Sequence, residues 1–104
     1  MNDLDKTFAA LADPTRRHVV DLLRERPRRA GELAAAARTS APAMSRHLRV
    51  LRESGLVAAD LLEDDARARV YSLRPQRLRS LQRWLDTFWG GQLAAFKRHV
   101  EPRP

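Results

Sequence analysis

The sequence contains no cysteine, and only four of its 104 residues are glycine. The absence of cysteine excludes disulfide bonds and thiolate-bound zinc. The sequence also lacks a glycine-rich phosphate loop and a Ser/His/Asp order with a recognisable turn, so it carries no motif of a familiar enzyme class. We therefore expect neither an enzyme nor a bound cofactor.

Long apolar segments are absent as well. No apolar run approaches the roughly 20 residues that a membrane-spanning helix requires. Residues 1–5 are acidic and lack the apolar core of a signal peptide. These features predict a cytoplasmic protein with no membrane partner. A chain of 104 residues is too short for two hydrophobic cores, so we expect residues 1–104 to form a single domain.

The chain carries an excess of positive charge. It contains 20 lysines and arginines against 13 aspartates and glutamates, which gives a formal net charge of +7. Such a surplus favours a polyanionic partner, and nucleic acid before a membrane surface. Compositional bias toward arginine and alanine can produce the same surplus without any partner, so charge alone leaves both interpretations open.

The segment 40–51 has the pattern of a helix with two different faces. Met44, Leu48 and Leu51 recur at the spacing of an amphipathic helix. Ser40 is a natural N-cap, and Pro42 is tolerated in a first turn whose N–H groups have no partners within the helix. Small residues, a hydroxyl and arginines occupy the other face. Such a helix can enter a DNA major groove, where arginine binds guanine. An ordinary surface helix with solvated arginines would show the same pattern.

The segments before this helix are also helical in pattern. Apolar periodicity predicts short helices over residues 3–11, 14–24 and 30–37, with a basic linker between the second and the third. The third helix is rich in alanine and leads through a short turn into the segment described above. Residues 30–53 therefore fit a helix-turn-helix.

The segments after residue 53 complete the fold prediction. Residues 56–73 are typical of a β-hairpin, which directly after a helix-turn-helix forms a wing. Residues 75–100 form one long helical pattern, interrupted by Gly90 and Gly91. We predict a mainly α protein with one small β-hairpin, a winged helix-turn-helix in the order α-α-α-α-β-β-α.

The two terminal helices, over 3–11 and 75–100, carry more apolar residues than one small domain needs. We expect these residues to form a homodimer interface: Leu4, Phe8, Leu11, Leu81, Leu85, Phe88 and Trp89. Together with Trp84, the aromatic residues could instead line a pocket for a small-molecule effector. An effector of unknown identity, small molecule or protein, stays open at this point.

Four motifs span residues 8–73. They are Phe8-x-x-Leu11-x-Asp13-Pro14-Thr15-Arg16-Arg17, Gly31-Glu32-Leu33-Ala34, Ser40-x-Pro42-Ala43-x-Ser45-Arg46-His47-Leu48-x-x-Leu51-x-x-x-Gly55-Leu56-Val57, and Tyr71-x-Leu73. In combination they resemble the ArsR/SmtB family of bacterial winged-helix transcription regulators. The pattern of Trp84, Leu85, Phe88 and Trp89 resembles the metal-independent branch of that family.

The resemblance implies a homodimeric repressor that binds double-stranded DNA at an inverted-repeat operator. In the family, the first and last helices form the dimer and the fourth helix enters the major groove. Carried over to this sequence, the DNA-facing positions are Ala41, Pro42, Ser45 and Arg46. Ser40, His47 and Arg49 are expected nearer the phosphates, and Arg67 of the wing completes the predicted DNA-contacting set.

The sequence departs from the family pattern at three places. Arg38 stands where the turn of the helix-turn-helix usually carries glycine, which predicts a strained backbone there. The wing tip, residues 63–65, is acidic, so phosphate should repel it. The family's thiolate ligand positions fall on Leu33 and the alanines after it.

A second family metal site, near the C-terminus, is incomplete in this sequence. Asp86 and His99 have the spacing of two of its ligands, but Phe88 and Pro102 occupy the other two positions. We therefore predict no metal site. The acidic wing also leaves an alternative function open, a winged-helix protein-interaction module with little DNA specificity.

Overall fold

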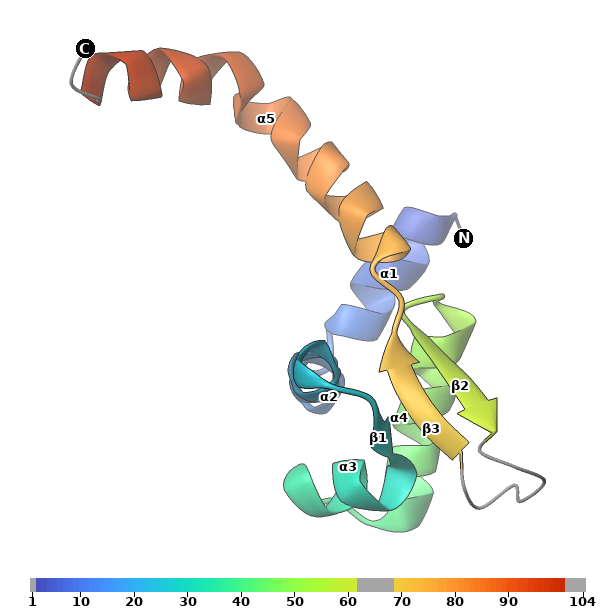
Figure 1. Ribbon diagram of the computed structural model, residues 1–104. Coiled ribbons are helices and arrows are strands. Elements are labelled where there is room, and N and C mark those ends of the chain that lie inside the picture. The colour runs from blue at the N-terminus through green and yellow to red at the C-terminus, as the bar shows by residue number, and fades with distance from the viewer. Residues whose placement is uncertain (1, 62–68, 101–104) are drawn as a thin grey trace.

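The computed structural model of the chain describes residues 2–61 and 69–100, which form five helices and three short strands (Figure 1). The elements in chain order are α1 (Asp3–Leu11), α2 (Pro14–Glu25), β1 (Arg28–Arg29), α3 (Ala30–Ala36), α4 (Ala41–Glu53), β2 (Val57–Leu61), β3 (Arg69–Leu73) and α5 (Gln76–Val100). The predicted mainly helical winged helix-turn-helix is confirmed, with every predicted helix present.

The strand β1 is an addition to the predicted order. Residues 26–29 were predicted to be only a basic linker, which is wrong for the last two of them. Arg28 pairs with Tyr71 and Arg29 with Val70, so that β1 lies antiparallel to β3 in a sheet of order β1-β3-β2. A strand of two residues is too short to show the alternation by which strands are recognised.

Polar side chains cap the starts of α2 and α4. Asp13 accepts a hydrogen bond from the N–H of Arg16 at 3.0 Å at the start of α2. Ser40 accepts one from the N–H of Ala43 at 3.2 Å at the start of α4. Each cap satisfies a first-turn N–H that has no partner within the helix, and a cap of this kind contributes about 1 kcal/mol.

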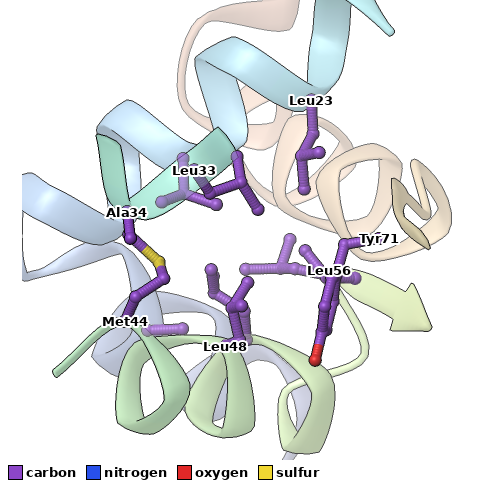
Figure 2. Packing of buried hydrophobic residues seen from close by; sticks show 11 residues of the cluster. Leu23, Leu33, Ala34, Met44, Leu48, Leu56 and Tyr71 are labelled. Atoms are coloured by element: carbon purple, nitrogen blue, oxygen red, sulfur yellow. The ribbon is translucent and has the colours of Figure 1, made fainter. Parts of the chain in front are cut away.

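The core lies between α2, α3, α4 and the sheet. Figure 2 shows Met44 and Leu48 of α4 directed toward Leu33 of α3, with Tyr71 of β3 at the side. The apolar stripe predicted for α4, which consists of Met44, Leu48 and Leu51, is buried. Since this stripe holds α4 against the core, the opposite face of the helix is left at the surface.

The turn between α3 and α4 contains a strained residue. Arg38 has a φ of 53°, which lies in the left-handed region where a side chain costs about 1–2 kcal/mol. The strain predicted from the missing glycine is confirmed.

Arg38→Gly is expected to stabilise the fold by up to about 1 kcal/mol, because glycine removes this strain but loses roughly 0.5–1 kcal/mol more backbone entropy on folding. The urea midpoint measures the effect. Arg38→Ala is the matched control, since it keeps the strain and removes the charge. An equal gain in both variants would assign the effect to charge and contradict the prediction.

The long helix α5 is tied to α1 and to the end of α4. Arg77 of α5 pairs with Asp3 of α1 at 3.0 Å. The same side chain lies against Gly55, where an added Cβ would come within 2.8 Å of its Nε. Gly55 also has a φ of +82°, as expected for a glycine that ends a helix. From this anchor α5 extends past α1 and away from the sheet (Figure 1).

Candidate DNA interface

The face of α4 opposite the core carries the chemistry expected of a DNA-reading helix. The side chains predicted to face DNA are exposed along this helix: Ala41, Pro42, Ser45 and Arg46. Ser40 at the N-cap and Arg49 one turn beyond Ser45 are exposed as well. The first turn of α4 therefore presents small side chains outward, and the positive end of the helix dipole there favours close approach by a phosphate backbone.

Two arginines give this face its positive charge. Arg46 and Arg49 are exposed, and within the described residues neither forms an ion pair with an acidic side chain. The guanidinium of each can therefore reach a base edge or a phosphate without breaking an internal salt bridge, which makes both candidates for direct contact with DNA.

His47 lies differently from the rest of the predicted DNA-contacting set. Its side chain is only 22% exposed, and its Nδ1 lies 3.4 Å from a guanidinium nitrogen of Arg16 and 3.8 Å from Oδ2 of Asp13. The N–H of Arg16 that caps onto Asp13 holds the pKa of that carboxyl below its ordinary value, and the charge of Arg16 acts in the same direction. His47 thus contacts the start of α2 as well as belonging to the recognition helix.

Part of the predicted interface falls on the wing tip. Arg67 and the acidic residues 63–65 lie outside the described residues. At the root of the wing, the hairpin pairs Val57 with Leu73 and Leu61 with Arg69. Asp60 and Arg69 are exposed there, so the described part of the hairpin carries one charge of each sign.

A second surface, on α1 and α5, is apolar. It consists of four aromatic side chains that are exposed to an unusual degree for their size: Phe8 at 41%, Trp84 at 39%, Phe88 at 59% and Trp89 at 40%. We call these four residues the aromatic surface. Phe8 packs edge-on against Trp84 at 5.3 Å, and Trp84 packs edge-on against Phe88 at 4.8 Å. The rings of Phe8, Trp84 and Phe88 thus form a continuous apolar row across both helices, and Trp89 is a further exposed aromatic residue on α5.

The other residues predicted for the dimer interface lie beside this row. Leu4, Leu11, Leu81 and Leu85 are half-buried. Trp84 is absent from the predicted interface set, although an interface was the preferred interpretation of the aromatic stripe that it forms with Phe88 and Trp89. Its packing between Phe8 and Phe88 places it at the centre of the aromatic surface.

Metal-ligating side chains do not gather in the described part of the chain. Among residues 2–60 and 69–89, whose side chains the structure describes, no three His, Cys, Asp or Glu lie close enough to hold a metal ion. Pro102, one of the positions in the C-terminal metal pattern, lies outside the described residues. No helix in the described ranges is long and apolar enough to cross a membrane.

Comparison with known proteins identifies a family that this chain matches. The family model described as "Bacterial regulatory protein, arsR family" matches residues 13–59. The HTH-type transcriptional regulator Rv2034 of Mycobacterium tuberculosis is 38% identical over 97 residues, which cover 93% of this chain and 88% of that one. The transcriptional repressor SdpR of Bacillus subtilis is 31% identical over 82% of this chain and 91% of its own.

A solved structure agrees with the fold. The homodimeric winged helix-turn-helix DNA-binding domain of Mb0332 from Mycobacterium bovis superimposes with a TM-score of 0.65 and 21% identity, covering 97% of this chain and 88% of that one. With its identity to Rv2034 and SdpR extending over most of both chains, the protein belongs to the arsR family of bacterial regulatory proteins and is a DNA-binding transcriptional regulator, not an enzyme.

Proposed function

We propose that this regulator is a cytoplasmic homodimeric repressor that acts on an inverted-repeat operator and does not respond to metal ions. The observation that carries the proposal is the exposed face of α4, on which a capped helix start, small residues and two arginines lie opposite a fully buried apolar stripe. The relative SdpR is a transcriptional repressor, which supports the direction of regulation.

The aromatic surface is the basis for the proposed dimer. The four exposed aromatic side chains of this surface are costly to leave in water, and a second copy of the same surface would cover them. A two-fold dimer would also place two recognition helices about 34 Å apart, one turn of DNA. The Mb0332 domain, which has the same fold, is homodimeric.

The proposed contacts divide into two groups. Ala41, Pro42, Ser45 and Arg46 approach base edges in the major groove, with Arg46 as the guanine reader. Ser40, His47 and Arg49 contact phosphates on either side, and Arg67 contacts DNA from the wing. Phosphate contacts position the helix while base contacts select the sequence.

Footprinting on the DNA upstream of the protein's own gene, followed by a salt titration on the protected duplex, tests the proposed function. We expect a two-fold symmetric footprint and an affinity that falls by about 0.9 log unit per log unit of salt for each neutralised phosphate. A protein-interaction module would give no footprint and only a weak affinity common to all sequences, and that result would overturn the proposal.

Zinc is expected to leave the operator affinity unchanged. The chain has no cysteine, and the described residues bring no three candidate ligands together, so a tetrahedral site cannot be completed from them. The measurement is operator affinity at increasing micromolar Zn²⁺, with EDTA-treated protein as the reference. Stoichiometric release of DNA by Zn²⁺ would contradict the prediction.

A further inference from the structure

Arg16 joins three helices through a single guanidinium group. Its Nε donates to the carbonyl of Ala10 at 2.7 Å, and Nη2 donates to the carbonyl of Ala9 at 3.1 Å. Both carbonyls belong to the last turn of α1, where helix carbonyls lack the regular i+4 N–H partner, although that of Ala9 also accepts the N–H of Ala12 at 3.4 Å. The third nitrogen, Nη1, lies 3.4 Å from Nδ1 of His47 on α4. Arg16 itself belongs to the first turn of α2.

The direction of the Arg16–His47 hydrogen bond fixes the state of the imidazole. A guanidinium group has donors and no acceptor, so Nδ1 of His47 must accept. In the neutral ring the proton then lies on Nε2. Asp13, the only carboxylate paired with this ring within the described residues, is 3.8 Å from Nδ1, which is too long for a hydrogen bond.

The protonated nitrogen of His47 is accessible. The described part of the chain contains no buried side-chain nitrogen or oxygen without a hydrogen-bond partner. Since the side chain of His47 is 22% exposed and its Nε2 has no hydrogen-bond partner among the described residues, we infer that this nitrogen reaches solvent. His47 follows Arg46 on α4, so its outward N–H lies on the flank of the proposed DNA-reading face.

We propose that Arg16 is a positioning residue that holds His47 with its Nε2–H directed outward, where it donates a hydrogen bond to a DNA phosphate. The proposal rests on the proposed role of α4 in DNA binding. The alternative tautomer would turn Nδ1–H toward Asp13 and present the Nε2 lone pair to the phosphate. Arg16 therefore decides whether His47 attracts or repels the DNA backbone.

The tautomer can be measured without DNA. Nitrogen-15 NMR of the full chain at pH 8 is expected to show a protonated Nε2 and an unprotonated, accepting Nδ1 in His47. In Arg16→Ala the proton is expected to move to Nδ1, facing Asp13. Arg17→Ala is the matched control. Arg17 also donates to a carbonyl at the end of α1, that of Leu11, and its substitution removes the same charge. A wild-type ring protonated on Nδ1 would overturn the proposal.

A pair of His47 variants tests the phosphate contact. The amide nitrogen of glutamine reaches approximately the position of Nε2, whereas that of asparagine lies near Nδ1. On the duplex that the wild-type protein selects from a random-sequence pool, His47→Gln is expected to keep its affinity and His47→Asn to lose about tenfold. Because the proposed donor is neutral, the salt dependence should be the same in both.

Three outcomes contradict this assignment and leave the proposed function standing. The first is equal DNA affinity of the two His47 variants, and the second is a slope of affinity against salt that is lowered by about 0.9 in His47→Gln. The third is an equal loss of DNA affinity in Arg16→Ala and Arg17→Ala. Circular dichroism of each variant separates a loss of the contact from a loss of the fold. If Arg16→Ala unfolds, Arg16→Lys replaces it, because lysine keeps the positive charge but lacks the forked guanidinium group. A wild-type protein that selects no duplex would refute the proposed function, while the NMR result would still decide the tautomer.

Discussion

Phe88→Glu is expected to convert the regulator from a dimer to a monomer and to lower its operator affinity by orders of magnitude. Phe88 is the most exposed member of the aromatic surface, at 59%, and contacts Trp84 edge-on. In the protomer a glutamate at this position would lie in water at little cost. In the proposed dimer it would be buried without a partner, which costs several kcal/mol, and symmetry applies the cost twice.

The loss of DNA affinity follows from the loss of the second recognition helix, since the α4 face of the variant is unchanged. Sedimentation equilibrium measures the oligomeric state, and a binding titration on the operator measures affinity. Thr87→Glu is the matched control. Thr87 is the exposed residue that precedes Phe88 on α5, so the variant places the same charge on a different face of the helix. A Phe88→Glu protein that remains dimeric and binds normally would show that the interface lies elsewhere.

Arg46→Ala is expected to produce the second largest effect, a loss of about 1–3 kcal/mol of specific affinity at each half-site. Arg46 is exposed near the start of α4, on the face opposite Met44 and Leu48. A guanidinium group there can form two hydrogen bonds with guanine, so its removal should also flatten discrimination at one base pair in each half-site. Competition with operators substituted at single positions measures both effects.

Arg83→Ala provides the comparison for Arg46→Ala, since Arg83 is an exposed arginine on α5 whose guanidinium contacts only Ser80 within the described residues. Removing it lowers the net charge by the same amount without touching α4. Equal losses in the two variants, with sequence discrimination intact, would mean that Arg46 contributes only bulk charge.

The helices could be predicted from the sequence because their signals are local. The spacing of Met44, Leu48 and Leu51 identifies the buried face of α4. The position of Ser40 predicts an N-cap, and its hydroxyl accepts the N–H of Ala43. The strain at Arg38 was predicted in a different way, from the family resemblance, because the family usually carries glycine at that position of the turn.

Features that depend on distant contacts were not predictable. The partners of His47 lie on α2, and Arg16 is 31 residues away in the chain, so no local pattern links them. The central place of Trp84 in the aromatic surface arises because α1 packs beside α5 and brings Phe8 against it. The exposure of the residues proposed to face DNA agrees with the sequence pattern, while the contact of His47 with Arg16 could not be predicted from it.

The two-residue strand β1 has a consequence for how the protein folds. Because Arg28 pairs with Tyr71, the whole helix-turn-helix and β2 are contained in one chain loop that this pairing closes. Closing so long a loop costs entropy that grows with the logarithm of its length, and contacts of this separation slow folding. We therefore expect β1 and β3 to pair late, after the local helices have formed. An excised peptide of residues 30–53 would lack both sides of this closure, and also Val19 and Leu23 of α2, which belong to the buried core, so we expect that it does not fold as an autonomous DNA-reading unit.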